Sequence, residues 1–329
     1  METFKWGIIG LGKIAHKFAK DLRFVEGATL HAVASRSEER SQIFADQYSV
    51  PQFYGTYSGI LTSGVDAVYI ATPHVSHMEL AIMTLEAEIP VLCEKAFGIN
   101  EEEVQRIVDT ARRRKVFLME ALWTRFLPNM LAVRAQIAQG DIGQIRSISA
   151  DFGFKAPFDP EKRLFNPQLG GGALLDIGIY PVFLAYSLLG EPEHISAAAQ
   201  LGTTGVDEEI GMLFTYESGA MAHLQASFRY TSPCEAHIYG YDGTIRIPSR
   251  WHEGKQYQIE RYAEDQVPQV HTHEYQASGY AFETLHVMEQ IRAGKIESPW
   301  WSLEDSLSLM RAMDRIRAII GLNYPQDVR

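Results

Sequence analysis

The sequence is poor in cysteine, in positive charge and in long apolar runs, and each shortage excludes a class of protein. Its 329 residues contain two cysteines, Cys93 and Cys234, without the spacing of a disulfide framework or a zinc site. The formal net charge is −11, which disfavours general attraction to nucleic acid or to an anionic membrane. We find no apolar stretch of membrane-spanning length and no signal-type N-terminus, so we expect a cytoplasmic protein without a membrane partner.

The first twenty residues have the pattern of a dinucleotide-binding unit. The apolar run Phe4–Ile9 predicts a buried strand, which is followed by a glycine turn and by an amphipathic helix from about residue 14. One glycine permits the tight turn, the next lets a pyrophosphate approach the backbone, and N–H groups at the helix start favour an anion. We therefore predict cofactor contacts from Gly10, Leu11, Gly12, Lys13 and Ile14.

Alternating strand and helix patterns continue to about residue 120. Further strands are predicted at 29–35, 67–71, 91–93 and 116–119, with helices between them. This alternation is typical of a parallel, doubly wound sheet that binds ligands at the carboxyl ends of its strands. We assign residues 1–121 to this Rossmann domain.

The rest of the chain, residues 122–329, predicts a second domain of α+β type with a large, mostly antiparallel open sheet. Strand patterns occur at 145–154, 210–216, 220–228, 235–247 and 255–262, and helical patterns at 280–293 and 302–322. Ser302 and Asp305 form a near capping box. One face of the 210–228 hairpin should pack on helices, and the other is either a homodimer surface or a modestly apolar exterior.

The end of the second strand indicates which dinucleotide binds. An NAD site usually has Asp or Glu there, whereas this chain has Ser35, Arg36 and Ser37, with Arg40 one helical turn further on. An arginine and two hydroxyls suit a 2′-phosphate, so we predict NADP rather than NAD. The alternative is that Arg36 and Arg40 are solvated surface charges.

The loops after the next two strands supply further candidates. Ala71, Thr72, Pro73 and His74 leave the strand beside the switch point, and His77 follows at the start of a helix. Either histidine can instead cap or pack the helix. Glu94 and Lys95 directly follow a core strand, and a lysine there is poorly explained by packing. We predict that all these residues border the cofactor.

A buried helix in the second half carries two polar residues. After Gly170, Gly171 and Gly172, the pattern over 173–189 is apolar nearly all round, yet Asp176 and Tyr180 lie on one face of it. They form either a structural hydrogen bond or, together with Lys95, a catalytic set.

These motifs resemble those of the glucose–fructose oxidoreductase, inositol dehydrogenase and rhizopine-catabolism (Gfo/Idh/MocA) family, most of all its dimeric dihydrodiol dehydrogenase branch. The resemblance covers the whole chain through GIIGLGKIA, ASRS, IATPHVSH, LCEKAFGIN, MEALWTRFLP and GGGALLDIGIYP. It implies NADP-dependent hydride transfer at a hydroxyl or carbonyl carbon of a sugar, diol or polyol. Ala96 stands where many members have proline, and Tyr180 where inositol-type members have histidine.

The resemblance also implies residue roles. Lys95, Asp176 and Tyr180 correspond to the catalytic set, with either Tyr180 or Lys95 taking the proton. Trp123, Arg125 and Phe126 are expected to line the pocket, although Arg125 is equally suited to an ion pair. Phe154 and Trp251 are weaker pocket candidates.

Two other functions and a metal site remain alternatives. A non-catalytic NADP-binding regulator does not need the catalytic set, and a Rossmann methyltransferase has no use for Arg36. His271 and His273 lie on one face of any strand, but no third ligand is evident, so we expect an exposed strand and no metal.

Overall fold

The computed structural model describes residues 3–262 and 267–328. The chain divides into two compact units. The first comprises Met1–Phe126 and Gln276–Leu307, and the second comprises Leu127–Tyr275 and Ser308–Arg329. The return of residues 276–307 to the first unit is not part of the sequence prediction, which assigned all of 122–329 to one domain.

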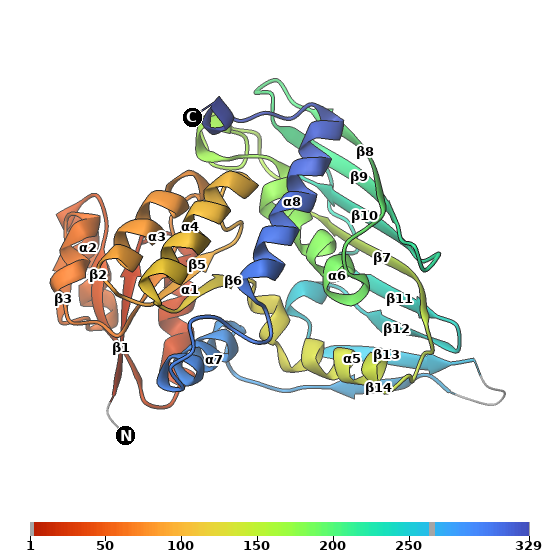
Figure 1. Cartoon of the computed structure of the whole chain (residues 1–329), viewed down its shortest axis with the longest axis horizontal. Coiled ribbons are helices and arrows are strands. Elements are labelled where there is room, and N and C mark those ends of the chain that lie inside the picture. Colours follow the sequence, from red (N-terminus) through yellow and green to blue (C-terminus); the bar gives the residue numbers. More distant parts are fainter. Residues whose placement is uncertain (1–2, 263–266, 329) are drawn as a thin grey trace. The chain divides into compact units, whose positions relative to one another are not determined.

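The first unit contains a six-stranded parallel sheet in the order β3-β2-β1-β4-β5-β6 (Figure 1). The strand order reverses between β1 and β4, which makes this the switch point of a doubly wound sheet. The strands are β1 (Phe4–Ile9), β2 (Ala28–Ala34), β3 (Gln52–Tyr54), β4 (Ala67–Ile70), β5 (Val91–Glu94) and β6 (Leu118–Ala121). Strands β4, β5 and β6 are buried on both faces, which explains their short apolar runs.

Polar side chains cap two of the helices of this unit. The helices are α1 (Lys13–Asp21), α2 (Glu38–Tyr48), α3 (His77–Glu86), α4 (Glu101–Arg114) and, from the returning segment, α7 (Tyr280–Arg292). Ser37 caps α2 and Asn100 caps α4 by accepting backbone N–H groups. Helix α3 packs on α4, and α1 packs on α7.

Asp21, at the end of α1, holds the returning segment. Its carboxylate accepts hydrogen bonds from Ser278 N, Ser278 Oγ and Tyr280 N at 3.0, 2.7 and 2.8 Å. Leu118 N also donates to Ile296 O at 3.0 Å. These contacts join residues distant in sequence, so no local pattern predicts them.

The second unit contains an eight-stranded sheet in the order β14-β13-β12-β11-β7-β10-β9-β8. All neighbours are antiparallel except β7 and β10, which confirms the predicted mostly antiparallel sheet. The strands are β7 (Ile145–Gly153), β8 (His194–Leu201), β9 (Asp207–Thr215), β10 (Met221–Ser227), β11 (Ala236–Gly240), β12 (Gly243–Ile247), β13 (Gln256–Arg261) and β14 (Gln269–Thr272).

Helices cover one face of this sheet (Figure 1). They are α5 (Pro128–Ala138), α6 (Ile179–Leu189) and the part of α8 (Leu303–Ile320) from Ser308 onward. Burial alternates along the central strands, so every second residue of β10 is enclosed while Met221, His223 and Gln225 are exposed. The predicted capping box forms, since Ser302 N donates to Asp305 and Asp305 N donates to Ser302.

One helical stretch, Pro167–Leu189, corrects the expectation that no apolar run reaches membrane-spanning length. It is long and apolar enough by composition, but 78% of its most apolar window is buried inside the protein. It also differs from a single regular helix, because residues Leu174–Gly178 form a π-helical turn before α6 begins.

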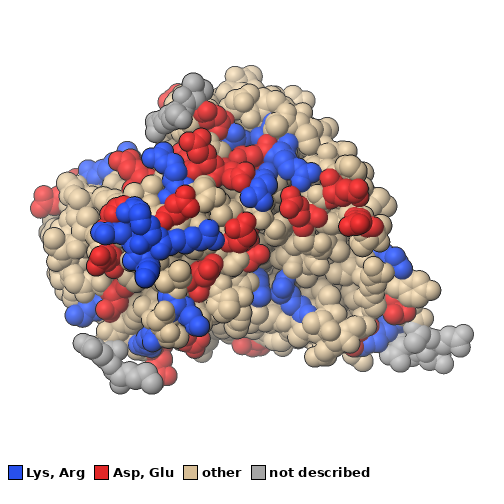
Figure 2. Space-filling view, viewed as in Figure 1, with Lys and Arg blue, Asp and Glu red and all other residues tan. Residues whose placement is uncertain are grey.

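Charges of both signs are interspersed on the face seen in Figure 2, where basic side chains lie beside acidic ones. Among the described residues, the basic end of α4 is paired in this way: Arg113 and Arg114 both contact Glu86. The basic side chains on this face, including a contiguous group at the left of Figure 2, are flanked by acidic ones.

Candidate functional site

A groove of about 390 Å³ opens at the carboxyl ends of β1, β2 and β4. Because this is where the strand order reverses, it is the expected ligand position of a doubly wound sheet. Ten of the predicted cofactor residues line it, together with Tyr57. The ten are Gly10, Leu11, Gly12, Ser35, Arg36, Ser37, Arg40, Ala71, Thr72 and Pro73.

The glycine turn shapes the floor of the groove. Gly10 has φ +89°, and a Cβ there would lie 2.6 Å from Thr72 Cγ2 and 2.9 Å from the Ala71 carbonyl, so only glycine fits. A Cβ on Gly12 would meet nothing within 4 Å, which leaves the backbone open to a ligand. Helix α1 has neither a side-chain cap nor an acid in its first turn, so its N–H groups suit an anion.

Hydroxyl groups fix the loop that presents Arg36. Ser35 Oγ hydrogen-bonds the Ser37 carbonyl at 2.8 Å and Ser41 Oγ at 2.9 Å, while Ser37 Oγ accepts from Arg40 N at 3.3 Å. No acidic side chain is among the described residues that line the groove. This end of the groove therefore presents a guanidinium and hydroxyl groups, and no carboxylate, to the ribose of a bound dinucleotide.

Tyr57 is a lining residue that the sequence analysis missed. It follows β3, a strand of three residues that carries too weak a pattern to be predicted. Since β3 pairs in parallel with β2, its carboxyl end lies beside that of β2. Recognising β3 would have indicated that residues after it border the same ligand.

Lys13 and Ile14 lie in the first turn of α1, just beyond the groove. The two histidines after β4 are buried. His77 is fully enclosed, with Nδ1 2.8 Å from the Ala96 carbonyl and Nε2 2.8 Å from the Thr72 carbonyl. Burial lowers its pKa to about 4. His77 thus supports two loops of the site rather than contacting the cofactor as predicted, and His74 packs edge-on against its ring.

Glu94 and Lys95 end β5 in the same unit. Glu94 is buried and accepts a short hydrogen bond from the hydroxyl of Tyr69, and the Lys95–Ala96 peptide bond is cis. The carboxyl group of Glu283 is enclosed nearby in the same unit, and burial, then the charges of Glu94 and Asp21, raise its pKa. Lys95 therefore follows a strand end at which the neighbouring carboxyl groups are buried, while Lys95 itself is half-buried.

Trp123 and Arg125 lie outside the groove. The Trp123 ring stacks on that of Tyr280, with centroids 4.9 Å apart, and Arg125 Nε donates to the Trp300 carbonyl at 3.1 Å. Both side chains are buried against the returning segment of the first unit. That segment was not assigned to this unit, so their surroundings could not be predicted.

Asp176 and Tyr180 belong to the second unit, on the π-helical turn and the start of α6. Asp176 accepts from both terminal nitrogens of Arg163, at 2.6 and 3.3 Å, a bidentate pair that the sequence analysis missed. The Tyr180 ring contacts the rings of Phe152 and His252. Arg163 lies in an irregular loop, where no spacing indicates its partner.

Of two weaker expectations, one needs correction. Trp251 is fully buried and donates from Nε1 to the Asp151 carbonyl at 3.0 Å, so it belongs to the core and not to a pocket. The segment with His271 and His273 was expected to be an exposed strand, and β14 is indeed exposed except at His271, although both half-buried histidine rings stack on Tyr257. No group of three or more potential metal ligands occurs among the described residues.

Comparisons with known proteins identify the family. Residues 4–122 match the oxidoreductase family with an NAD-binding Rossmann fold, and residues 130–246 match the GFO/IDH/MocA C-terminal domain. The chain belongs to the Gfo/Idh/MocA family. It is therefore an NAD(P)-binding oxidoreductase with the predicted two-sheet architecture.

The curated relatives narrow the branch within the Gfo/Idh/MocA family. The chain is 35% identical to the trans-1,2-dihydrobenzene-1,2-diol dehydrogenase of Mus musculus, over 99% of this chain and 100% of that one. It is 36% identical to the Danio rerio enzyme, over 99% of both. These matches confirm the dihydrodiol dehydrogenase branch and an NAD(P)-dependent dehydrogenase.

Solved structures of the family share the fold. A 3-ketoreductase from Actinomadura kijaniata, in complex with TDP-benzene and NADP, is 25% identical with a TM-score of 0.83, over 97% of this chain and 98% of that one. An aldose-aldose oxidoreductase from Caulobacter crescentus, complexed with glycerol, is 23% identical with a TM-score of 0.88, over 100% and 99%.

Proposed function

We propose that the chain is an NADP-dependent dehydrogenase that acts on a trans-dihydrodiol, a sugar or a related polyol. The observation that carries the choice of NADP is the groove end formed by Ser35, Arg36 and Ser37, which has a guanidinium and hydroxyls and no carboxylate. A carboxylate would repel a ribose phosphate, whereas Arg36 can bind it in a bidentate manner. The dihydrodiol relatives support the substrate class.

The proposed chemistry assigns roles to three further side chains. When bound, the nicotinamide accepts or donates the hydride. Either Tyr180 or Lys95 takes the proton of the substrate hydroxyl. A phenol has an ordinary pKa of ~10. Asp176 contributes a carboxylate, paired with Arg163, one helical turn before Tyr180. General acid–base help of this kind is typically worth ~10² to 10⁴ in rate.

We further propose that residues 1–121 act as the cofactor domain and residues 122–329 as the substrate and dimerisation domain of a cytoplasmic homodimer. The face of the eight-stranded sheet opposite its helices supports dimerisation, because it exposes Met221 and Tyr239 among small and polar side chains. Sedimentation equilibrium tests this part separately, and a monomer at micromolar concentration would contradict it.

Titration with NADPH and NADH, followed by cofactor fluorescence, tests the cofactor assignment. We expect wild type to prefer NADPH, and Arg36→Ala to weaken NADPH binding about 10- to 100-fold while leaving NADH binding nearly unchanged. Arg23→Ala, an arginine of the same unit outside the groove, is the matched control. Equal or tighter binding of NADH by wild type would contradict the assignment.

Turnover tests the activity. Wild type is assayed with trans-dihydrodiols and aldoses in the presence of NADP, and Lys95→Ala is expected to abolish the reaction while still binding NADPH. NADPH binding without turnover of any such substrate would favour the alternative, a non-catalytic NADP-binding regulator of the same fold.

A further inference from the structure

His252 lies against Tyr180 in the second unit. The two ring centroids are 5.2 Å apart with an angle of 52° between the planes. Phe152 contacts both rings: it stacks on His252 with centroids 4.1 Å apart and lies 5.5 Å from Tyr180. Both His252 and Tyr180 are buried. Two aromatic rings, those of Phe152 and His252, therefore pack against the phenol that the proposed reaction uses.

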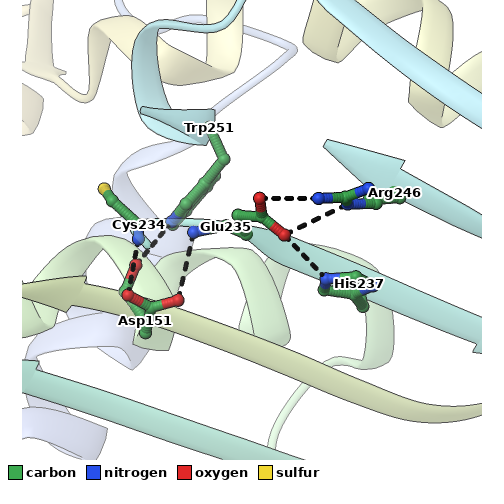
Figure 3. A network of polar contacts seen from close by, with 6 residues as sticks. All are labelled: Asp151, Cys234, Glu235, His237, Arg246 and Trp251. Atoms are coloured by element: carbon green, nitrogen blue, oxygen red, sulfur yellow. Dashed lines mark hydrogen bonds and ion pairs between the residues drawn. The ribbon is translucent and has the colours of Figure 1, made fainter. Parts of the chain in front are cut away.

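The backbone that carries His252 is fixed from β7. Asp151 accepts backbone N–H groups of Cys234 at 2.7 Å and Glu235 at 3.0 Å through its carboxylate (Figure 3). Its carbonyl accepts from Trp251 Nε1 at 3.0 Å, and Trp251 N donates to the Cys234 carbonyl at 3.2 Å. One strand residue thus holds both the Cys234 turn and the 3-10 turn Trp251–Glu253.

The Cys234 thiol fixes the orientation of the His252 ring. Cys234 Sγ lies 3.6 Å from His252 Nδ1, and Cys234 has φ 55°, an uncommon backbone conformation that Asp151 maintains. Burial raises the pKa of the thiol to about 12, so the sulfur keeps its proton at neutral pH. A thiol and an imidazole nitrogen at this distance form a hydrogen bond in which either atom can be the donor, and the pair restricts rotation of the ring.

We propose that His252 is a positioning residue for Tyr180: its ring, oriented by Cys234 and stacked on Phe152, holds the phenol in one rotamer. This inference rests on the proposed function, in which Tyr180 contacts the substrate hydroxyl. A phenylalanine at 252 would fill the same space but leave the buried thiol without this hydrogen-bond partner. A histidine satisfies both requirements, since it provides a flat face for packing and a nitrogen for the thiol.

The size of the effect follows from geometry. A displacement of about 1 Å at a reacting group can reduce a rate by ~10²-fold. Loosening the Tyr180 ring acts on the chemical step, whereas the cofactor groove lies in the other unit and is untouched. If His252 positions Tyr180, its replacement lowers kcat and leaves NADPH affinity unchanged. If its role is purely structural, its replacement lowers the melting temperature and does not affect kcat selectively.

Four variants separate the ring from the hydrogen bond. His252→Asn keeps a hydrogen-bonding group near the position of Nδ1 and removes the ring, whereas His252→Phe keeps a ring and removes that group. Cys234→Ala removes the partner of the ring nitrogen and Cys234→Ser restores one. His237→Asn is the matched control, because His237 pairs with Glu235 in the adjoining network but is not among the rings against Tyr180 (Figure 3).

We expect His252→Asn to lower kcat roughly 10- to 100-fold, with the Kd for NADPH within about twofold of wild type. Cys234→Ala should lower kcat by a smaller factor, and Cys234→Ser should restore most of it. Wild-type kcat in both His252 variants would overturn the proposal. So would an equal loss in His237→Asn.

A second readout does not depend on turnover. With 3-fluorotyrosine incorporated and the Tyr180 resonance assigned by Tyr180→Phe, ¹⁹F NMR reports the mobility of that ring. The resonance should shift or broaden in His252→Asn and remain unchanged in His237→Asn. If wild type turns over no diol or sugar but this change occurs, the proposed function fails and the packing role stands. An unchanged resonance overturns the inference itself.

Discussion

The hydroxyl of Tyr324 donates a 2.6 Å hydrogen bond to the carbonyl oxygen of Gly171. Gly171 belongs to the glycine loop that precedes the π-helical turn carrying Asp176. The backbone of Tyr324 is itself fixed, because its N–H donates to Asp327 at 2.7 Å and Arg317 donates to the same carboxylate oxygen at 2.7 Å. The last turn of the chain thus holds the start of the helix that presents Tyr180.

Tyr324→Phe should lower the free energy of unfolding by ~1–2 kcal/mol, because it leaves the buried Gly171 carbonyl without this donor. Tyr216→Phe is the matched control. The Tyr216 hydroxyl is buried in the same unit, and no described residue forms a hydrogen bond with it. Removing that hydroxyl should be neutral or stabilising. Urea unfolding measures both variants, and equal losses would contradict the assigned role of the Tyr324 bond.

Asp207 makes the stability of this region depend on pH. It is fully buried, its Oδ2 accepts from Leu174 N at 2.6 Å, and its Oδ1 has no partner among the described residues. Burial raises its pKa to about 7. Because the folded state then binds a proton more tightly than the unfolded state, this contribution to stability is complete below about pH 4 and is lost as pH rises through 7.

Asp207→Asn should remove that dependence, since a neutral amide resembles the protonated acid. We expect the variant to gain stability relative to wild type as pH rises from 4 to 8, and each tenfold change in proton affinity corresponds to about 1.4 kcal/mol. Thermal unfolding at a series of pH values measures the difference. A difference that does not change with pH would show that the Asp207 carboxyl is ionised throughout.

Local signals in the sequence account for much of the fold and for the groove. Gly10 and Arg36 were found because a glycine turn and a strand end are encoded by neighbouring residues, and switch-point geometry then fixes their position. The same holds for the caps Ser37 and Asn100. The side chain of each accepts a hydrogen bond from the backbone N–H three residues further on, in the first turn of the helix that follows. Elements with strong local periodicity were therefore predictable.

Contacts between segments that are distant in the sequence could not be predicted from local patterns. Asp21 and Tyr280 are 259 residues apart, and the capping of α7 depends on their meeting. The prediction that His77 contacts the cofactor rests on its position after β4, and no local pattern reveals the two carbonyl groups that hydrogen-bond to its ring. His252 lies in a short 3-10 turn and Arg163 in an irregular loop, so only the tertiary structure brings them to Tyr180 and Asp176.

Arg163 should matter for turnover through Asp176. Its two terminal nitrogens donate to both carboxylate oxygens, and Lys cannot reproduce this fork. We expect Arg163→Lys to lower kcat/KM roughly tenfold with unchanged NADPH affinity. The neighbouring Lys162→Ala removes an exposed ion pair with Asp159 and should have little effect. An equal loss in the two variants would contradict a specific role for the Arg163 pair.

Replacement of the buried Asp21 should strongly reduce the stability of the first unit. Helix α7 begins after Gly279, which offers no side-chain cap, and the Asp21 carboxylate takes over this role by accepting from Tyr280 N and Ala281 N at 2.8 and 3.4 Å. A carboxylate at a helix N-terminus also interacts favourably with the helix dipole. Asp21→Ala should therefore lower the free energy of unfolding by ~2–4 kcal/mol, and Asp21→Asn by about half as much.

A local substitute cannot replace this cap. Gly279 has φ +119°, a conformation that side-chain-bearing residues rarely adopt, so Gly279→Ser should add strain rather than rescue Asp21→Ala. Asp66→Ala is the control, because Asp66 accepts one exposed hydrogen bond, from Lys5 N, and its loss should cost under ~1 kcal/mol. Hydrogen exchange of the α7 amides distinguishes the outcomes. Faster exchange confined to α7 in Asp21→Ala is expected, and unchanged exchange there would mean that packing alone holds the returning segment.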